Sequence, residues 1–298
     1  MFTHSVCSYP QRGNYGKSGY RGNCTGYIIR DFVESYLAPE GLFADPSIGS
    51  GTSSDVAEEM GIRFKGTDLH QGYNLLTQDF AAFLGEQANL IWWHPPYWNM
   101  IRYSGNQWGD AANPWDLSQM DLEQFQEAML LAMMNIHDAT EQGGHYGILM
   151  GNMRKDGRYY NLSSMVERMA AGRLVDEIIK IQHNCVSDSR QYGGKLVRIA
   201  HEKLLVFKKE IQTALYFLAK AMNRVEAVTA VTWKAAVRRV LQAADGRNMG
   251  LTEIYGEMEP YAAARAENRN WQAKVRQVLQ DERFFLRVGK GIYALKTE

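Results

Sequence analysis

The sequence predicts an α/β protein with a mainly parallel sheet, followed by a small second domain. Three observations carry this prediction. Strand-like and helix-like runs alternate over residues 12–209, a glycine-rich turn follows the strand-like run that ends at Asp45, and the pattern changes after Lys209. Such alternation is typical of parallel sheets covered by helices on both faces. Ligands bind in these folds outside the carboxyl ends of the strands.

The elements of the first domain follow in order along the chain. Residues 1–26 are rich in Gly, Tyr, Asn and Arg and show little periodicity, so we expect a loop-like segment there that is either ordered or clamping. Helices are expected in YIIRDFVESYL, GTSSDVAEEM, DLEQFQEAMLLAMMNIHDAT and LSSMVERMAAG. Strands are expected in GLFAD, RFKGTD, ANLIWW, GHYGILMGN, RLVDEIIKIQHN and HEKLLVFKK.

The residues after 210 predict a different domain. A linker helix is expected over 211–230 and a separate domain over 231–298, which leaves 1–210 as the first domain. Helical runs lie in TWKAAVRRVLQAA, LTEIYGEM and ENRNWQAKVRQVLQ, and RFFLRVGKGIYALK contains two β-rich runs around a Gly-Lys-Gly turn. Three helices and a hairpin indicate a winged-helix-like module.

Composition bounds the class of protein. Hydrophobic residues make up 45% and charged residues 22%, which is typical of a soluble globular chain, and no apolar run approaches the ~18–20 residues of a membrane span. The beginning of the chain lacks the apolar run of a secretory signal, and the three cysteines lack metal-ligand spacing. We therefore expect a cytoplasmic protein with no membrane partner and no metal.

Charge is distributed unevenly along the chain. Residues 211–298 hold 14 Lys and Arg against 9 Asp and Glu, whereas residues 1–210 hold 19 against 24. A neutral protein with a basic C-terminal region is a modest indication of a polyanionic partner.

The turn DPSIGSGTSSD, residues 45–55, has three nucleotide-binding interpretations. A P-loop is disfavoured because the only Gly-Lys-Ser, at Gly16, has Gln11 where the first glycine belongs and follows no strand. A nicotinamide-type G-x-G-x-x-G has Ser54 in place of its third glycine. The third interpretation is S-adenosylmethionine, whose cationic amino and sulfonium groups favour an acid such as Asp45 beside the turn.

Further acids follow the next strands. Asp68 ends the second strand and is placed to accept both ribose hydroxyls, a feature that dinucleotide and methyl-donor sites share. Asp79 could bond an adenine amino group while Phe80 covers the ring, although Asp79 could equally be a helix cap. The discriminating segment is His94-Pro95-Pro96-Tyr97, a rigid strand exit that nicotinamide enzymes do not need.

With both motifs in place, residues 12–209 resemble the amino-group DNA methyltransferases, which make N6-methyladenine or N4-methylcytosine. DPSIGSGTSSDVA is similar to their D-P-F-x-G-S-G-T-T cofactor motif, and HPPY to their [DNS]-P-P-[YFW] catalytic motif. RGNCTGYIIRDFV and GGHYGILMGNMRKDGRYYNL are similar to segments before the first motif and after the second. The resemblance implies a Rossmann-like class I methyltransferase sheet with S-adenosylmethionine as cofactor.

The resemblance also implies roles for individual residues. The cofactor would contact ten of them: Asn23, Asp45, Pro46, Ser47, Gly49, Gly51, Thr52, Asp68, Asp79 and Phe80. His94 and a proline carbonyl would accept the N–H groups of a flipped base, so that its nitrogen lone pair can attack the methyl group. Tyr97 would stack on that base, unless it and Trp98 are ordinary core aromatics.

His94 departs from the family, which carries Asp, Asn or Ser at this position. A neutral imidazole accepts through one nitrogen, and a protonated one accepts nothing. Histidine could serve as the acceptor, the site could act on another target such as cytosine or RNA, or the chain could be a degenerate scaffold that still binds DNA. The first hypothesis predicts that His94→Ala loses turnover and His94→Asp keeps much of it. It also predicts a fall in activity at acid pH, near about 6.5 or wherever the site shifts the pKa of His94.

The C-terminal domain is the candidate DNA reader. Its last helix places Trp271, Val275, Val278 and Leu279 on one face, with cations elsewhere. The candidate DNA contacts are Arg269, Lys274, Arg276 and Lys290. An ordinary packing or dimerisation module would look the same. The sequence thus predicts a DNA methyltransferase that acts on an exocyclic amine, adenine N6 by preference, with a short or relaxed target sequence.

Overall fold

A computed structural model describes residues 1–185, 196–210, 232–244, 247–263 and 270–296. The chain divides into two compact units, which are described separately. The first consists of Met1–Leu75 and Phe80–Lys209, and the second of Leu76–Asp79 and Glu210–Glu298. The predicted linker helix over 211–230 lies outside the described residues.

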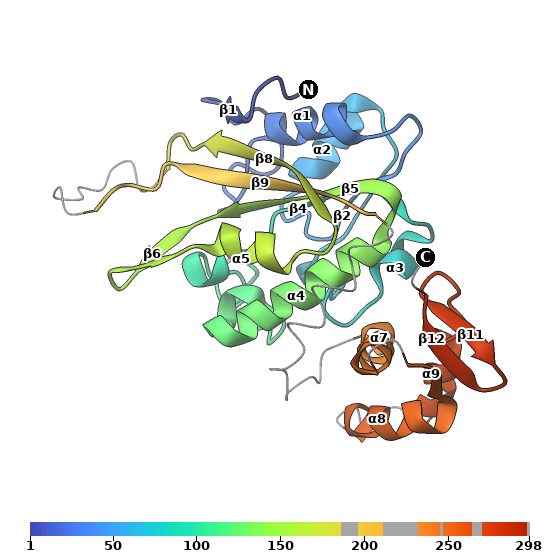
Figure 1. The fold of residues 1–298 in the computed structure, drawn as a ribbon. Helices are drawn as coiled ribbons and strands as arrows, with labels where there is room; N and C mark the ends of the chain where they lie inside the picture. Colours follow the sequence, from blue (N-terminus) through green and yellow to red (C-terminus); the bar gives the residue numbers. More distant parts are fainter. Residues whose placement is uncertain (186–195, 211–231, 245–246, 264–269, 297–298) are drawn as a thin grey trace. The chain divides into compact units, whose positions relative to one another are not determined.

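The first unit is built on a seven-stranded sheet of order β1-β8-β9-β5-β4-β2-β3 (Figure 1). Its strands are β1 (Val6–Ser8), β2 (Phe43–Asp45), β3 (Phe64–Gly66), β4 (Ala88–Trp93), β5 (Thr140–Gly151), β8 (Arg173–Ile181) and β9 (His201–Lys208). β2 pairs in parallel with β3 and β4, and β4 with β5, whereas β9 runs antiparallel to its neighbours β5 and β8. The prediction of an α/β, Rossmann-like sheet is confirmed.

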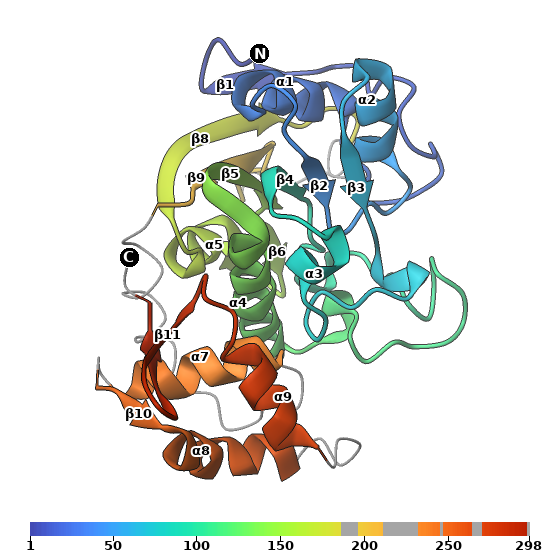
Figure 2. The same cartoon turned by 90° about the vertical axis from the view of Figure 1, so that its right-hand side faces the viewer.

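Helices cover both faces of this sheet (Figure 2). α1 (Gly26–Tyr36) and α2 (Thr52–Met60) lie on one face; α3 (Phe80–Leu84), α4 (Leu122–Ala139) and α5 (Leu162–Met169) lie on the other. Short 3₁₀ turns span Leu69–Gln71, Trp98–Met100 and Leu117–Gln119. α4 starts with a capping box between Asp121 and Gln124, which satisfies backbone donors at both residues.

The core under α1 follows from the spacing of its apolar residues. Ile28, Ile29, Phe32 and Val33 recur at helical spacing and are buried against strand residues that include Leu90. Thr25 caps the helix through its side-chain oxygen, which accepts from Tyr27 N. This packing fixes α1 on the sheet beside the loop that follows β2.

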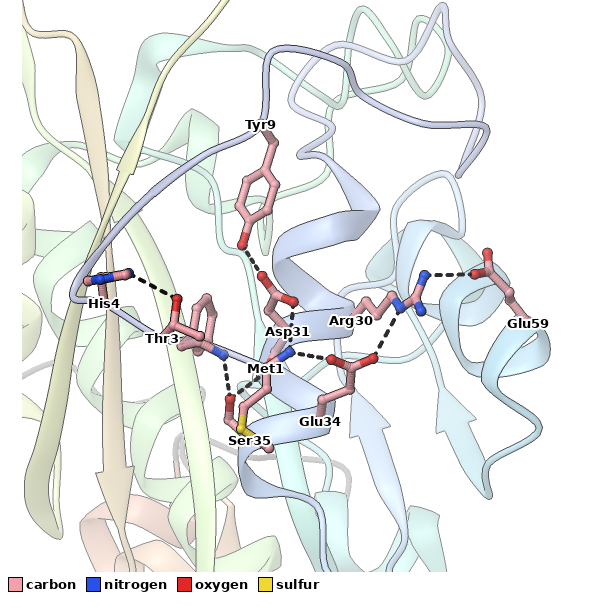
Figure 3. Close-up of polar contacts among 10 residues, drawn as sticks. Met1, Thr3, His4, Tyr9, Arg30, Asp31, Glu34, Ser35 and Glu59 are labelled. Atoms are coloured by element: carbon pink, nitrogen blue, oxygen red, sulfur yellow. Dashed lines mark hydrogen bonds and ion pairs between the residues drawn. The ribbon is translucent and has the colours of Figure 1, made fainter.

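The N-terminal segment contains a short strand that the sequence did not predict. β1 pairs in parallel with β8 at the edge of the sheet, and its three residues are too few to show a period. Tyr9, just after β1, donates its hydroxyl to Asp31 of α1, and Arg30 bridges Glu34 in the same helix and Glu59 in α2 (Figure 3). The segment is therefore fastened to the helices that flank the loop after β2.

The described part of the second unit combines three helices with an antiparallel sheet of order β10-β12-β11. Its described elements are α7 (Trp233–Ala243), β10 (Met249–Gly250), α8 (Leu251–Ala263), α9 (Trp271–Val278), β11 (Phe285–Gly289) and β12 (Ile292–Leu295). Its core gathers Val237, Ile254, Met258, Val275 and Phe285. α8 is longer than predicted because it continues through Pro260, and β10 was missed because two residues show no alternation.

A smaller hairpin follows β5 in the first unit. β6 (Met153–Lys155) pairs antiparallel with β7 (Arg158–Tyr160). The connection is Asp156-Gly157, and both residues have positive φ, at 50° and 75°. This is the backbone that two-residue hairpin turns require.

Candidate active site

The glycine-rich loop and the His94–Tyr97 segment lie at the same edge of the sheet. β2 and β4 are parallel neighbours, so the residues that follow them leave the sheet side by side. Trp93, the last residue of β4, donates from Nε1 to Ser47 Oγ at 3.2 Å. The two segments therefore form one site. Its "loop half" is residues 45–55 with Asp68, and its "histidine half" is His94, Tyr97, Glu202 and Lys180.

Two glycines set the path of the loop. Gly49 has φ of 53° and Gly51 has φ of 97°, a left-handed conformation that favours glycine. Gly51 is the N-cap of α2 and carries no capping side chain, so the first backbone donors of the helix face the loop. Pro46 follows Asp45 and stiffens the exit from β2.

Asp45 is buried beneath the loop. One carboxylate oxygen accepts from Ser47 N at 2.8 Å and the other from Ser53 Oγ at 2.5 Å. Burial raises the pKa of Asp45 to about 7, against the lowering effect of these two hydrogen bonds; the charge of Asp68 adds to the increase. Asp45 thus shapes the loop from below, and a cation bound at the loop would favour its ionised form.

Asp68 supports the loop from the next strand. β3 ends at Gly66, two residues earlier than predicted, and Asp68 caps the 3₁₀ turn that follows. One oxygen accepts from Gly49 N at 2.8 Å, and the other accepts from His70 N at 3.1 Å and lies 2.6 Å from His70 Nδ1. The hydrogen bond to Asp68 raises the pKa of His70.

The N-terminal segment closes over the loop, as the clamping interpretation predicted. Gly16 N donates to Asp55 in α2 at 2.6 Å, and Ser50 Oγ donates to Asn23 Oδ1 at 2.6 Å. A Cβ placed on Gly16 would lie 2.5 Å from Thr52 Oγ1, so this glycine permits a close approach. Thr52 Oγ1 is itself buried and has no hydrogen-bond partner among the described residues, which marks a donor or acceptor that a ligand could satisfy.

An aromatic group beside the loop half was missed by the sequence reasoning. Trp108 donates from Nε1 to Tyr20 Oη at 2.9 Å, and its ring stacks on His70 with centroids 5.5 Å apart. The centroid of the Tyr103 ring lies 5.3 Å from that of Trp108 and 6.1 Å from that of Tyr20. These residues come from three separate segments, and none has a spacing that would have indicated the group.

The histidine half is held by a chain of hydrogen bonds. His94 Nε2 lies 2.9 Å from Tyr97 Oη, and Tyr97 donates its hydroxyl proton to Glu202 Oε1 at 2.9 Å. Glu202 Oε2 accepts from Lys180 Nζ at 2.6 Å. Pro95 is buried between His94 and Pro96, which keeps this exit from β4 rigid. Glu202 and Lys180 were not predicted, because nothing in their local sequence connects them with HPPY.

Burial controls the charge state of this chain. It lowers the pKa of His94 to about 4, against a raising effect of Glu202, so the imidazole is neutral near pH 7. Burial and Glu202 together raise the pKa of Tyr97 well above its ordinary value. Burial alone would raise the pKa of Glu202, but the Lys180 ammonium and the hydrogen bonds lower it below that of an ordinary glutamate.

Asp79 and Phe80 have other contacts than those predicted for them. Asp79, which directly precedes α3 and belongs to the second unit, forms an ion pair with Lys234 of the same unit at 2.9 Å. Phe80 is fully buried at the start of α3, where it packs against Tyr73 and Phe83. Their roles at the adenine stay predictions.

The predicted DNA contacts lie on the second unit. Lys274 and Arg276 are exposed on α9, whose buried face holds Val275, and Lys290 is exposed in the turn between β11 and β12. Arg276 donates to Tyr255 Oη at 2.8 Å. Arg269 lies outside the described residues.

In the described part of the chain, no three His, Cys, Asp or Glu side chains converge as metal ligands would. Nor does any helix of these ranges combine the length and apolar character needed to cross a membrane.

No protein-family model matches the chain, and no curated protein matches its sequence. Similar solved structures include TrmN, an rRNA methylase and a small-molecule N1-methyltransferase, each named here by its own description. TrmN from Thermus thermophilus is 14% identical over 63% of this chain and 50% of that chain, with a TM-score of 0.36. An rRNA methylase from Streptococcus thermophilus is 13% identical over 61% and 95%, with a TM-score of 0.33.

The third is 1,6-didemethyltoxoflavin-N1-methyltransferase from Burkholderia thailandensis, with S-adenosylhomocysteine bound. It is 10% identical over 62% of this chain and 78% of that chain, with a TM-score of 0.37. This chain spans half the length of TrmN. At this level of similarity none of the three assigns an activity, and the description of the fold rests on the strand order given above.

Proposed function

We propose that this chain is an S-adenosylmethionine-dependent methyltransferase that acts on an exocyclic amine of a DNA base, adenine N6 by preference. One observation carries the proposal above the others. The glycine-rich loop after β2 and the HPPY segment after β4 meet at one edge of the sheet and are joined by the Trp93–Ser47 hydrogen bond. A methyl donor held at the first would face an amine held at the second.

The charges around the loop support a cationic cofactor over a phosphate-bearing one. Asp45, Asp55 and Asp68 all place carboxylates against the loop or the first turn of α2. A pyrophosphate at this helix N-terminus would meet these carboxylates at short range, whereas an ammonium or sulfonium would be stabilised by them. Cofactor contacts are proposed for Pro46, Ser47, Gly49, Gly51 and Thr52 of the loop, for Asn23 of the N-terminal segment and for Asp68 after β3.

The bound cofactor would supply an electrophilic methyl group on a sulfonium. The protein's contribution is to orient the amine. His94 would accept one N–H proton and the Pro95 carbonyl the other, because two accepted hydrogen bonds favour a pyramidal nitrogen with its lone pair free. Tyr97 would lie against the base, which must leave the duplex to reach this site.

The β6–β7 hairpin supports a nucleic-acid substrate. Lys155 Nζ lies 4.8 Å from the centre of the Trp98 ring, and the Arg154 guanidinium lies 4.9 Å from that of Tyr159. Trp98 directly follows HPPY, so these cations and aromatics adjoin the histidine half. Alternating cations and aromatic rings are what flipped or single-stranded nucleotides bind.

The deciding experiment is methyl transfer from labelled S-adenosylmethionine to unmethylated DNA, followed by mass spectrometry of the nucleosides, with an RNA substrate in parallel. We expect N6-methyladenine. N4-methylcytosine would support the same mechanism with cytosine as the target base. Product on RNA alone would mean that the substrate is RNA and not DNA. Measurable cofactor binding without product on either polymer would overturn the enzyme assignment in favour of a DNA-binding scaffold.

The hairpin has its own test. Arg158 is exposed in β7, and we expect Arg158→Gln to weaken DNA binding and lower the slope of log Kd against log salt by about one. Arg63→Gln is the matched control, because Arg63 is also an exposed arginine but pairs with Glu86 near β3. Equal salt slopes for both variants would remove the hairpin from the interface. Lys274, Arg276 and Lys290 of the second unit are proposed as further phosphate contacts and can be tested in the same titration.

A further inference from the structure

We propose that Tyr97, Glu202 and Lys180 form a positioning relay that fixes the tautomer of His94, so that Nε2 carries the ring proton and Nδ1 presents a lone pair to the substrate amine. The inference rests on the proposed function for the identity of that amine. The arrangement of protons itself follows from contacts within the first unit. It explains how a histidine can stand where an oxygen acceptor is expected.

The direction of the relay is set by its far end. Lys180 on β8 and Glu202 on β9 are directly opposite each other in the antiparallel ladder, and their side chains meet at 2.6 Å. An ammonium has only protons to give, so Glu202 is an ionised carboxylate and can only accept. Tyr97 Oη therefore uses its phenol proton in the hydrogen bond to Glu202 Oε1 at 2.9 Å.

The protonation of the His94 ring, at the other end of the relay, follows from the role of Tyr97. With its proton given to Glu202, Tyr97 Oη can only accept from His94 Nε2, 2.9 Å away. A neutral imidazole carries one N–H, so Nδ1 must be unprotonated. Nδ1 makes no hydrogen bond to any described residue and is not among the buried side-chain atoms that lack a partner. An acceptor is therefore left open on the side of the ring away from Tyr97.

A glycine makes the relay geometrically possible. β5 lies between β4 and β9 in the sheet, so the Tyr97 side chain must cross the end of β5 to reach Glu202. Gly151 is the residue of β5 paired with Glu202, and a Cβ there would lie 2.5 Å from Tyr97 Cε2. The absence of a side chain at Gly151 opens this path.

The relay differs from a general base. Burial lowers the pKa of His94 to about 4, which makes Nδ1 a weak base but leaves its lone pair available as an acceptor. Without the relay, either ring nitrogen could carry the proton, and in one of the two tautomers an N–H would face the amine donor. Tyr97 and Glu202 are thus positioning residues, acting through His94.

The first test measures the tautomer directly in the full chain. In ¹⁵N-histidine protein at pH 7, with the His94 signals assigned by their loss in His94→Asn, we expect Nε2 to resonate as a protonated nitrogen and Nδ1 as an unprotonated one. Tyr97→Phe should mix the two tautomers. Tyr36→Phe is the matched control, because Tyr36 also donates to a carboxylate of β8, that of Asp176 at 2.7 Å, and should leave the His94 signals unchanged. A protonated Nδ1 in the unmodified chain would overturn the proposal, whether or not the protein methylates DNA.

The second test uses turnover. Phenylalanine keeps the aromatic ring, so Tyr97→Phe should lower kcat, with little change in KM, by the factor that the measured tautomer ratio gives, which is about twofold for an even mixture and about tenfold if nine-tenths of His94 carries its proton on Nδ1. In a His94→Asn background the same change should cost less than about twofold, because an amide oxygen accepts without a tautomer. Equal costs in both backgrounds would overturn the relay and leave Tyr97 with a role in base stacking. Gly151→Ala, which crowds the Tyr97 ring, should reproduce the Tyr97→Phe pattern.

Discussion

The two halves of the site are held in place by different means. In the loop half, Asp45 bonds to residues two and eight positions away, and Asp68 bonds to His70 two positions on. In the histidine half, Tyr97 bonds to Glu202 across 105 residues. Contacts within the loop half span two to nineteen residues, and the N-terminal segment adds bonds across 27 and 39 residues, whereas the histidine half depends on the pairing of distant strands.

The charges of the two halves differ in the same way. The loop half gathers the carboxyl groups of Asp45, Asp55 and Asp68, whose partners are backbone amides, a hydroxyl and the His70 ring, and carboxyl groups at this density suit a cation. In the histidine half the Glu202 charge is matched by Lys180, and a neutral imidazole is left facing the substrate. One half is built to hold charge and the other to direct a hydrogen bond.

The largest effect is expected from removing the acceptor of the histidine half. His94→Ala should lower kcat by about a hundredfold or more, because a preorganised hydrogen bond at the reacting group is lost. His94→Asn should keep most of the rate, since its amide oxygen accepts in place of Nδ1. The measurement is single-turnover methyl transfer with saturating cofactor. Equal rates for the unmodified chain and His94→Ala would break the comparison, because the histidine half would then lack a catalytic role.

What the sequence could predict follows this division. The loop, Asp45, Asp68 and the HPPY exit lie in contiguous stretches whose glycine and proline positions constrain the backbone locally. Glu202 and Lys180 sit in ordinary strand sequence, and their pairing depends on the register of β8 with β9. The aromatic group of Tyr20, Tyr103 and Trp108 was missed because its members lie in loops and turns of separate segments, whose contacts are set by the folded chain. Register between distant strands is a property of the packed sheet that local periodicity does not carry.

The fold divides similarly. The alternation of strands and helices was sufficient to predict the sheet, because turn residues and periodic helices mark the boundaries of its strands, even of the three-residue strands β2 and β3. The short strands β1 and β10 were missed, since two or three residues show no period. The continuation of α8 through Pro260 was missed because proline usually ends a helix, and here packing of Met258 and Ala262 stabilises the longer form.

A smaller effect is expected from disturbing the clamp on the loop half. Gly16 has φ of 61°, and a Cβ there would lie 2.5 Å from Thr52 Oγ1 and 2.6 Å from Ser50 Oγ. Gly16→Ala should therefore weaken S-adenosylmethionine binding about tenfold by displacing the loop, with a backbone cost of about 1–3 kcal/mol. Isothermal titration calorimetry measures the affinity.

Gly61 provides the matched control for this change. It has nearly the same φ, 63°, at the end of α2, but a Cβ there meets nothing within 4 Å. Gly61→Ala should lower the midpoint of thermal unfolding, because the alanine backbone is strained there, and should leave cofactor affinity unchanged. If both variants bind the cofactor like the unmodified chain, the N-terminal segment does not shape the loop half.

The smallest effect concerns pH, for which the two halves should have opposite signs. Burial raises the pKa of Asp45 from 3.8 to about 7, so the contribution of Asp45 to stability is present below about 3.8 and is lost as pH rises through about 7. Burial lowers the pKa of His94 from 6.5 to about 4, so its contribution is present above about 6.5 and is lost as pH falls through about 4. Between these limits the two terms offset each other.

Single substitutions should separate the two terms. Asp45→Asn removes the first, so the free energy of unfolding should rise more steeply from pH 5 to pH 7 than in the unmodified chain, by at most about 1.4 kcal/mol per pH unit. His94→Asn removes the second and should change the slope in the opposite direction. Urea unfolding at pH 5, 6 and 7 measures both slopes, with Glu177→Gln, which breaks the ion pair to Lys203 on the same two strands, as the control. If both variants change the slope of the unfolding free energy against pH in the same direction, the two halves share one electrostatic environment. The contrast between a half that holds charge and a half that directs a hydrogen bond would then no longer hold.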